Sequence, residues 1–204
     1  MFTGLIRELA QVKSFRGNHL SLKATHKPKL GDSIAINGTC LSVVSVESDG
    51  FSVELSPETL QHIATEKLNG LVHIEPAMMM GDRFEGHIVQ GHIDTIGTIE
   101  SISDNGNSYD VIVKVDSEFI PLIPPKGSIT IDGISLTVND VSKESFRLTI
   151  IPITMRETLF GTYKKGTRVN IETDMFARYM HHILTASKSK GMSWNDIEHI
   201  QSLY

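Results

Sequence analysis

Cysteine is almost absent from this chain, since only Cys40 occurs among 204 residues. One thiol cannot form an internal disulfide, and this composition is typical of a reducing compartment. No uncharged apolar run approaches the roughly 18 residues that a membrane-spanning helix needs. The first eight residues also lack the basic start and apolar middle of a signal peptide. We therefore expect a cytoplasmic protein with no membrane partner.

Long runs of basic residues are missing as well. The net charge is -5 and the isoelectric point is near 6.0, so no Lys or Arg cluster could follow a phosphate backbone, and we expect no nucleic-acid partner. The sequence contains no phosphate-binding loop, no dinucleotide-binding glycine pattern after a strand and no metal-ligand cluster. His87 and His92 lie five residues apart and would point to opposite faces of a strand, so they are poor partners for one metal. We expect no cofactor and no metal.

The dominant feature of the sequence is an internal repeat. Ser33–Val43 reads SIAINGTCLSV, and Ser128–Val138 reads SITIDGISLTV at an offset of 95 residues. At that offset, 10 of the 28 positions from 33 to 60 are identical. This period is too long for a solenoid, whose repeats run to roughly 20–50 residues, and it fits two duplicated domains. Each copy of about 100 residues is large enough to bury a core.

The repeat also sets the domain boundaries that we predict. Thr3–Ile6 aligns with Gln90–Ile93, so each copy opens with a similar segment. We predict one domain over residues 1–86, a second over 87–174 and a helical segment with a tail over 175–204. Met78, Met79 and Met80 fall between the copies, and we expect them to fill gaps where the domains meet.

Turn signals and period-two alternation predict an all-β fold for each copy. Asn37-Gly38 and Asp132-Gly133 each lie between apolar strands, and both pairs accept the positive φ angles of a tight hairpin. Each copy offers about six short strands, which favours a small antiparallel barrel or sandwich. Residues 57–67 could hold one or two helical turns.

The period changes after the second copy. Apolar residues recur at helical spacing, and Asp174 is placed to cap the start of this helix. The stripe comprises Met175, Phe176, Tyr179, Met180, Ile183 and Leu184. Lys188–Gly191 has the composition of a hinge, and Ser193 with Asp196 resembles a capping box before a second helical segment.

Two small nucleophilic side chains occupy matched positions in the copies. Cys40 and Ser135 follow the hairpin turns, and Ser42 and Thr137 lie two residues further on the same strand face. Taken alone, Cys40 is best explained as a small buried residue, and the histidines as partly buried hydrogen-bonded groups. A duplicated apolar core does not explain polar atoms on the same face in both copies, so paired sites are the simpler interpretation.

Five segments together closely resemble the riboflavin synthase family of the alpha-chain type. They are residues 1–6, 37–43, 57–60, 86–94 and 126–138, and the resemblance covers about residues 1–185. Leu5 and Ser42 stand where the family usually has Ile and Thr. The resemblance implies two tandem six-stranded Greek-key barrels followed by a C-terminal helix that assembles a homotrimer. It also implies active sites between the N-terminal barrel of one subunit and the C-terminal barrel of another.

The family's reaction is a dismutation. One 6,7-dimethyl-8-ribityllumazine transfers a four-carbon unit to a second, giving riboflavin and 5-amino-6-ribitylamino-uracil, so two substrate molecules share one active site. No external redox partner is needed, which agrees with the absence of cofactor motifs. Holding two flat rings together can lower a barrier by roughly 7–11 kcal/mol.

The resemblance assigns roles to residues that match the family's motifs. The catalytic set is Phe2, Cys40, His87, His92, Ser135 and Thr137. The first lumazine site would be lined by Gly4, Leu5, Ile6, Cys40, Leu41, Ser42, Glu54, Leu55, Ser56, Pro57, Glu58 and Thr59. The second would be lined by Gly91, His92, Ile93, Lys126, Ser135, Leu136, Thr137, Thr149, Ile150, Ile151, Pro152, Ile153 and Thr154. In this assignment Leu5 belongs with the thiol and His92 with the hydroxyl.

Two other functions remain open from the sequence. A lumazine or flavin-binding protein of the same superfamily would keep both barrels without turnover, and an unrelated two-barrel interaction module would need no polar residues on matched faces. The presence of Cys40, His87, His92 and Ser135, together with Phe2, favours the enzyme.

Overall fold

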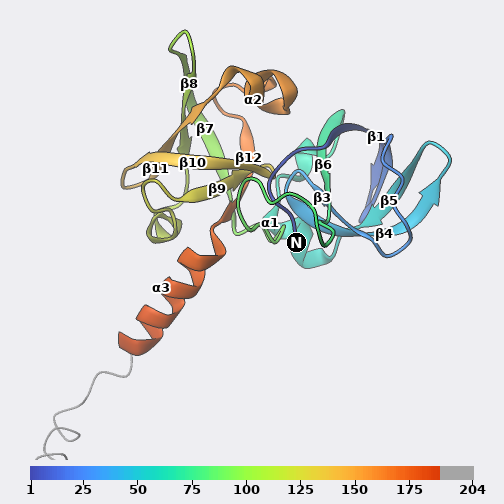
Figure 1. Cartoon of the computed structure of the whole chain (residues 1–204), viewed down its shortest axis with the longest axis horizontal. Helices are drawn as coiled ribbons and strands as arrows, with labels where there is room; N and C mark the ends of the chain where they lie inside the picture. The colour runs from blue at the N-terminus through green and yellow to red at the C-terminus, as the bar shows by residue number, and fades with distance from the viewer. Residues whose placement is uncertain (189–204) are drawn as a thin grey trace, which may run out of the picture.

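The computed structural model describes residues 1–188, and its strands close into two antiparallel barrels that lie side by side (Figure 1). The first barrel contains β1 (Glu8–Arg16), β2 (His19–Lys23), β3 (Ser33–Ile36), β4 (Thr39–Glu47), β5 (Gly50–Glu54) and β6 (Leu71–Pro76). The second contains β7 (Thr95–Asp104), β8 (Tyr109–Lys114), β9 (Ser128–Ile131), β10 (Ile134–Val141), β11 (Ser145–Ile150) and β12 (Arg168–Thr173).

Both barrels have the same strand order. Around the first barrel the strands run β1-β2-β5-β4-β3-β6, and around the second they run β7-β8-β11-β10-β9-β12. Adding six to each strand number of the first order gives the second, so the topology is duplicated along with the sequence. The predicted pair of six-stranded Greek-key barrels is confirmed.

The hairpin turns have the geometry that their sequences predict. Asn37 and Gly38 have φ angles of 45° and 82°, and Asp132 and Gly133 have 47° and 83°. Two positive φ angles in a row define the tight turn that asparagine-glycine and aspartate-glycine favour. The turns also meet between the barrels, because a Cβ on Gly38 would lie 2.6 Å from the Gly133 backbone nitrogen. Glycine is therefore required there for close approach as well as for conformation.

Short helices connect the strands outside the barrels. In the first barrel α1 (Pro57–His62) and the 3-10 helix η1 (Thr65–Lys67) fill the predicted helical segment. The Ser56 hydroxyl caps α1 by accepting a hydrogen bond from Thr59 N at 3.0 Å. The second barrel carries η2 (Ser117–Leu122), α2 (Pro152–Glu157) and η3 (Leu159–Thr162).

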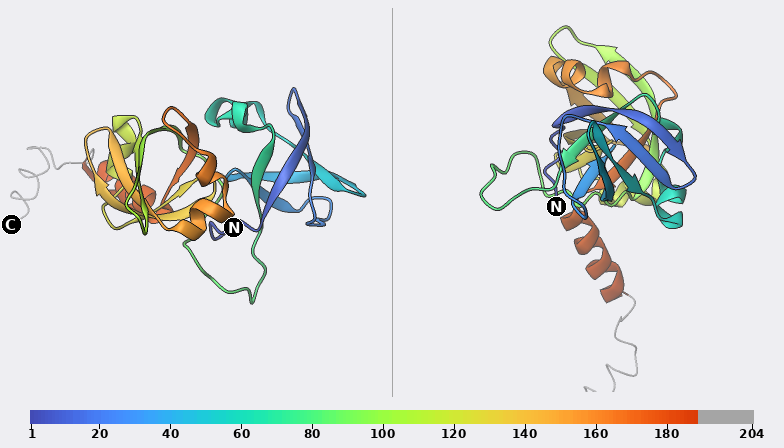
Figure 2. Two further views of the ribbon diagram at one scale, coloured as in Figure 1. Left: turned by 90° about the horizontal axis from the view of Figure 1, so that it is seen from above. Right: turned by 90° about the vertical axis from the view of Figure 1, so that its right-hand side faces the viewer.

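A long helix, α3 (Met175–Lys188), follows the second barrel. As predicted, Asp174 caps its start, since Phe176 N donates to Asp174 Oδ1 at 2.8 Å. The helix projects away from both barrels (Figures 1 and 2), and five of its large apolar side chains are 55–60% exposed. They are Phe176, Tyr179, Met180, Ile183 and Leu184. The predicted hinge and second helical segment lie almost entirely beyond residue 188, outside the described part of the chain.

The leading segments of the two copies cross at the junction between the barrels. Phe2 and Val89 form an antiparallel bridge, with Phe2 N donating to Val89 O at 2.8 Å and Val89 N donating to Phe2 O at 3.1 Å. Beyond the bridge, Ile6 packs against the core of the second barrel and Ile93 against the core of the first. Each leading segment therefore packs against the core of the opposite barrel. The N-terminus of the chain lies between the two barrels (Figure 2).

The three consecutive methionines do not fill this junction, so that prediction is wrong. Met79 and Met80 are 72% and 103% exposed, because the connection between the barrels loops out from the molecule (Figure 2). The junction is filled instead by a small buried cluster of Phe2, Ala35 and Val89. None of the helices within residues 1–188 is both long and apolar enough to cross a membrane.

Polar side chains reach across the junction in a nearly symmetric way. His73 Nε2 accepts a hydrogen bond from Leu159 N of the second barrel at 2.8 Å. Asn170, which corresponds to His73 in the matched motifs VHIE and VNIE, accepts a hydrogen bond at Oδ1 from Ala64 N of the first barrel, also at 2.8 Å. Burial lowers the pKa of His73 to about 4, with Asp132 opposing the shift, so His73 is neutral near pH 7.

Candidate active sites

A cavity of about 220 Å³ lies beside the thiol of Cys40, and we call it the Cys40 pocket. It is formed by the start of β4, by helix α1 and by the leading segment of the second copy. Its lining residues are Thr39, Cys40, Glu58, Thr59, His62, Ile63, Gly91, His92 and Ile93. The pocket therefore places a thiol, two exposed imidazoles and two threonines around one small space.

Gly91 explains why the leading segment can approach Cys40 so closely. Cys40 N donates to Gly91 O at 2.8 Å, and a Cβ on Gly91 would lie 2.6 Å from the Cys40 Cβ. Gly91 also has a φ of 79°, which L-residues with side chains rarely adopt. Glycine at this position brings His92 to the mouth of the pocket.

The Ser135 site has the same backbone geometry. Ser135 N donates to Gly4 O at 2.8 Å, and a Cβ on Gly4 would lie 2.6 Å from the Ser135 Cβ. Unlike the thiol, the hydroxyl has an imidazole partner, because Ser135 Oγ lies 2.7 Å from His87 Nδ1. Burial lowers the pKa of His87, and nearby Asp174 opposes this shift. A neutral His87 can accept the Ser135 proton, which is the arrangement that activates a hydroxyl nucleophile.

The predicted grouping of the leading segments with the two sites is wrong. Gly4 lies against Ser135 rather than Cys40, and Gly91 and His92 lie with Cys40 rather than Ser135. Leu5 follows Gly4 toward the second barrel. The physical reason is the crossing at the Phe2–Val89 bridge, which exchanges the segments between barrels. Both sites consequently have a histidine: His92 beside the thiol and His87 bonded to the hydroxyl.

Phe2 has a different role from the one expected. It is fully buried in the junction, and the half-buried Cys40 packs against its cluster. Its buried side chain packs behind Cys40, so within this chain it acts on the site through the position of Cys40. Its place in the catalytic set stays a prediction.

Three of the predicted lining residues point into the barrels instead. Leu41 and Leu55 belong to the core of the first barrel and Ile150 to the core of the second. Leu136 is half-buried against the second core. Alternation along each strand explains this, since the neighbours Cys40 and Ser135 face outward.

The other predicted residues lie at the surface around the two sites. Beside the Cys40 pocket, Ser42, Glu54, Ser56 and Pro57 are exposed. On the second barrel, Lys126, Thr137, Ile151, Pro152 and Ile153 are exposed, and Thr154 is half-buried. Thr149 is engaged elsewhere, because its hydroxyl donates to Asp110 Oδ1 at 2.8 Å and accepts from Arg147.

Lys126 has an unusual backbone conformation for a lysine. Its φ is 65°, whereas the equivalent residue of the first barrel, Gly31, has a φ of 85°. A side chain in this region costs roughly 1–2 kcal/mol relative to ordinary conformations. A strained exposed lysine where the duplicate uses glycine favours a role in binding.

Several residues of these sites were not identified from the sequence. Thr39, His62 and Ile63 line the Cys40 pocket. Thr39 Oγ1 is the one buried side-chain polar atom without a hydrogen-bond partner among the residues that the structure describes. Asp174 was expected only as a helix cap. Within residues 1–188, no group of three or more His, Cys, Asp or Glu is arranged to hold a metal ion.

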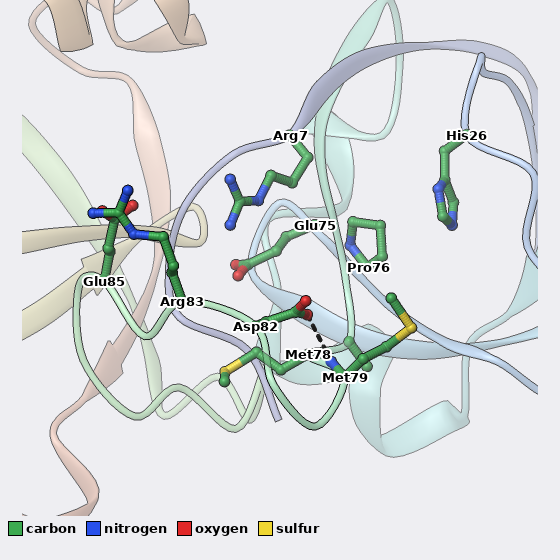
Figure 3. Close-up of a pocket in the computed structure, with 10 residues that line it drawn as sticks. Arg7, His26, Glu75, Pro76, Met78, Met79, Asp82, Arg83 and Glu85 are labelled. Atoms are coloured by element: carbon green, nitrogen blue, oxygen red, sulfur yellow. Dashed lines mark hydrogen bonds and ion pairs between the residues drawn. The ribbon is translucent and has the colours of Figure 1, made fainter.

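A larger cavity of about 610 Å³ lies under the connection between the barrels (Figure 3). It is lined by Arg7, His26, Glu75, Pro76, Ala77, Met78, Met79, Asp82, Arg83 and Glu85, none of which is a predicted site residue. Figure 3 shows the guanidinium of Arg7 on the side of the cavity toward which Glu75 points.

Comparison with known proteins agrees with the duplication. The lumazine binding domain family matches twice, at residues 3–77 and 90–174. Riboflavin synthase of Actinobacillus pleuropneumoniae is 42% identical over 193 residues, which cover 90% of each chain. Riboflavin synthase of Photobacterium phosphoreum is 37% identical over 198 residues, covering 92% of this chain and 91% of the relative. The Bacillus subtilis (strain 168) enzyme is 36% identical over 193 residues and 90% of each chain.

Solved structures share the double-barrel fold at lower identity. LumP in complex with riboflavin superposes with a TM-score of 0.75 at 21% identity, covering 85% of this chain and all of LumP. LumP in complex with 6,7-dimethyl-8-(1'-D-ribityl) lumazine gives 0.73 at 21% identity, with 85% and 99% covered. At such identity the likeness concerns the fold, whereas the curated relatives match closely along nearly the whole chain. This chain is therefore an enzyme of the riboflavin synthase family, built from two lumazine-binding domains.

Proposed function

We propose that the enzyme catalyses the dismutation of two molecules of 6,7-dimethyl-8-ribityllumazine. One molecule gives up the four carbons of its dimethyl-substituted edge and becomes 5-amino-6-ribitylamino-uracil. The other gains these four carbons as the new ring of riboflavin. All atoms and electrons are accounted for within the two substrates, so the reaction needs no cofactor.

The observation that carries this proposal is the pair of equivalent sites with different reactive groups. Identical substrates must play different roles in a dismutation, one as donor and one as acceptor. The backbone surroundings of Cys40 and Ser135 are alike, but only Ser135 has a bonded imidazole. Two sites with like backbone surroundings and different reactive groups suit one substrate in two roles.

The chain's own side chains supply a nucleophile and bases. Ser135, whose proton His87 can accept, is placed to add to an electrophilic ring carbon. His92 lies exposed at the Cys40 pocket, where it can exchange a proton with the acidic 7-methyl group of a bound lumazine. Thr59 and Cys40 contact the ring in the same pocket.

The size of the Cys40 pocket supports shared active sites. Its 220 Å³ is below the roughly 300–1,000 Å³ of pockets that enclose a drug-sized ligand, so one ring would remain open on one side. The second ring would then come from the second barrel of another subunit. The exposed apolar residues of α3 are suited to such an assembly, and we propose a homotrimer in the cytoplasm.

Incubation with the lumazine tests the function directly. We expect riboflavin and the ribitylamino-uracil to appear in equal amounts, followed by absorption and by chromatography. Tight binding with no product would identify a non-catalytic lumazine-binding protein instead. Light scattering should give three times the chain mass, and the double variant Phe176→Ser, Met180→Ser should lower that mass and the turnover together.

A further inference from the structure

Two buried glutamates hold the crossing segments in place. Glu75 accepts hydrogen bonds from Thr3 N and Oγ1, both at 2.8 Å, and from Gly4 N at 3.0 Å. Glu172, at the equivalent end of β12, accepts from Gln90 N and Gly91 N at 2.8 Å and from His92 N at 3.2 Å. They are 3% and 1% exposed. Each carboxylate therefore binds consecutive backbone N–H groups next to a candidate site.

The surroundings of the two carboxylates differ in one cation. Arg178 lies in the second turn of α3, and its Nη2 is 3.5 Å from Glu172 Oε1. Arg178 also donates to Asp94 Oδ1 at 3.0 Å and to Gln90 Oε1 at 2.7 Å. Asp94 is fixed in turn by Thr173, whose N and Oγ1 both donate to Asp94 Oδ2 at 2.7 Å. Glu75 has no ion pair of this kind among the described residues, although Arg7 lies on its side of the cavity (Figure 3).

An ionised glutamate is needed for these contacts. Only the carboxylate can accept three N–H groups with both oxygens, because a protonated carboxyl has a donor on one of them. Burial of the charge is costly unless hydrogen bonds and an opposite charge offset it. Burial raises the pKa of Glu172 to about 7, while the Gln90 and Gly91 N–H groups and Arg178 lower it and Asp94 raises it. Among residues 1–188, the charged groups that act on Glu172 are Arg178 from α3 and Asp94 from the turn before β7. Thr130, its neighbour on β9, is neutral.

We propose that Glu172 and Arg178 are positioning residues for the Cys40 pocket. Arg178 keeps the Glu172 carboxylate ionised, and the carboxylate fixes the Gln90–His92 backbone so that His92 faces the pocket. The catalytic geometry of the first barrel then depends on α3, the helix that follows the second copy. This inference rests on the proposed function for its turnover measurement, but not for its spectroscopic one.

The experiment compares Arg178→Gln with three matched variants of the full chain. Arg178→Lys restores the positive charge, and Glu172→Gln removes the titrating group. Arg168→Gln removes an exposed arginine whose ion pair, among residues 1–188, is with Glu66 on the surface. Riboflavin formation is measured between pH 6 and pH 9. In parallel, the His92 imidazole signal is followed by NMR, assigned by its loss in His92→Asn.

An adjacent cation lowers a carboxyl pKa by about one unit or more. We therefore expect the acid limb of the kcat/KM profile in Arg178→Gln to lie about one pH unit higher than in wild type. At pH 6.5 this variant should be about tenfold slower than wild type, and near pH 9 it should approach wild type. In Arg178→Lys the acid limb should return most of the way to its wild-type position. Glu172→Gln should be slow at every pH and lack this limb, and Arg168→Gln should match wild type.

The NMR signal separates this inference from the proposed function. If Arg178→Gln shifts the His92 signal at pH 6.5 and the shift disappears near pH 9, the positioning role stands even for a protein without turnover. An enzyme that makes riboflavin, with an unaltered pH profile and an unaltered His92 signal in Arg178→Gln, would overturn the inference and leave the function intact.

Discussion

The two barrels are copies in backbone and differ in the chemistry at their shared junction. Their strand orders match, and so do their irregularities: the register shift between Val43 and Ser45 recurs between Val138 and Asp140. At the junction, however, a free thiol near His92 corresponds to a hydroxyl bonded to His87. Duplication therefore preserved the backbone frame of the two sites, while substitutions at the junction gave them different reactive side chains.

Removal of the reactive side chains should have the largest effect and should separate the two sites. Ser135→Ala loses the group that His87 activates, so we expect turnover to fall by about 10²–10⁴-fold. Cys40→Ala should lower turnover less, because the described structure gives the thiol no basic partner within hydrogen-bonding distance. Both are measured as riboflavin formation, with circular dichroism as a control for folding. A larger loss from Cys40→Ala than from Ser135→Ala would reverse the assignment of nucleophile.

Alanine at either crossing glycine should disturb one site and spare the other. In Gly91→Ala the new Cβ would lie 2.6 Å from the Cys40 Cβ, so the segment that carries His92 must move. A displacement of about 1 Å can cost about 100-fold in rate. Gly4→Ala should act on Ser135 in the same way, and the broken Ser135–His87 bond should be visible as a change in the His87 NMR signal. If both variants perturb the same histidine, the crossing of the segments is wrong.

The pH dependence of stability should expose another difference at the junction. His73 has a folded pKa of about 4, below its usual 6.5, so it contributes stability above pH 6.5 that is lost as the pH falls toward 4. This contribution is about 3 kcal/mol. Glu172 acts in the opposite direction, since its raised pKa of about 7 favours the fold at low pH and this gain is lost between pH 4.5 and 7.

His73→Asn, which copies Asn170, isolates the histidine's share. Urea unfolding at pH 7 and pH 4 should show a smaller loss of stability on acidification in this variant than in wild type, by about 3 kcal/mol. Equal losses would mean that His73 is not kept neutral by burial.

Lys126→Gly should have the smallest effect on stability and a separate effect on binding. Glycine relieves the left-handed strain at φ 65°, so we expect the free energy of unfolding to be unchanged or to rise by about 1 kcal/mol. If Lys126 contacts substrate, KM should increase in the same variant. Loss of stability with unchanged KM would show that the lysine is structural.

The sequence was sufficient for the fold but not for the pairing of segments with sites. Asn37-Gly38 and Asp132-Gly133 predicted the two hairpins, and the internal repeat predicted two barrels. The similarity of Thr3–Ile6 to Gln90–Ile93 shows that these segments are equivalent. The similarity would be the same whether each segment contacted its own barrel or the opposite one, so it cannot distinguish the two arrangements. The sequence does not show the crossing at the Phe2–Val89 bridge, which brings each segment to the site of the opposite barrel.

The sequence carries a signal for the two buried carboxylates. Glu75 and Glu172 end the matched strand motifs VHIE and VNIE, and a repeated acidic residue in an alternating apolar strand indicates a buried partner. The exposure of Met79 and Met80 could not be predicted, because a loop that turns outward needs no special composition. The role of Phe2 also depends on burial, which an isolated N-terminal residue does not reveal.

The most direct test of the account is a label on the only thiol of the chain. A trifluoroacetonyl group on Cys40 reports its surroundings by fluorine NMR, and His92 and His62 line its pocket. We predict that His92→Asn shifts the fluorine signal of the label and that His87→Asn leaves it unaltered. A signal that responds to His87→Asn and not to His92→Asn would contradict the crossed arrangement of the two barrels.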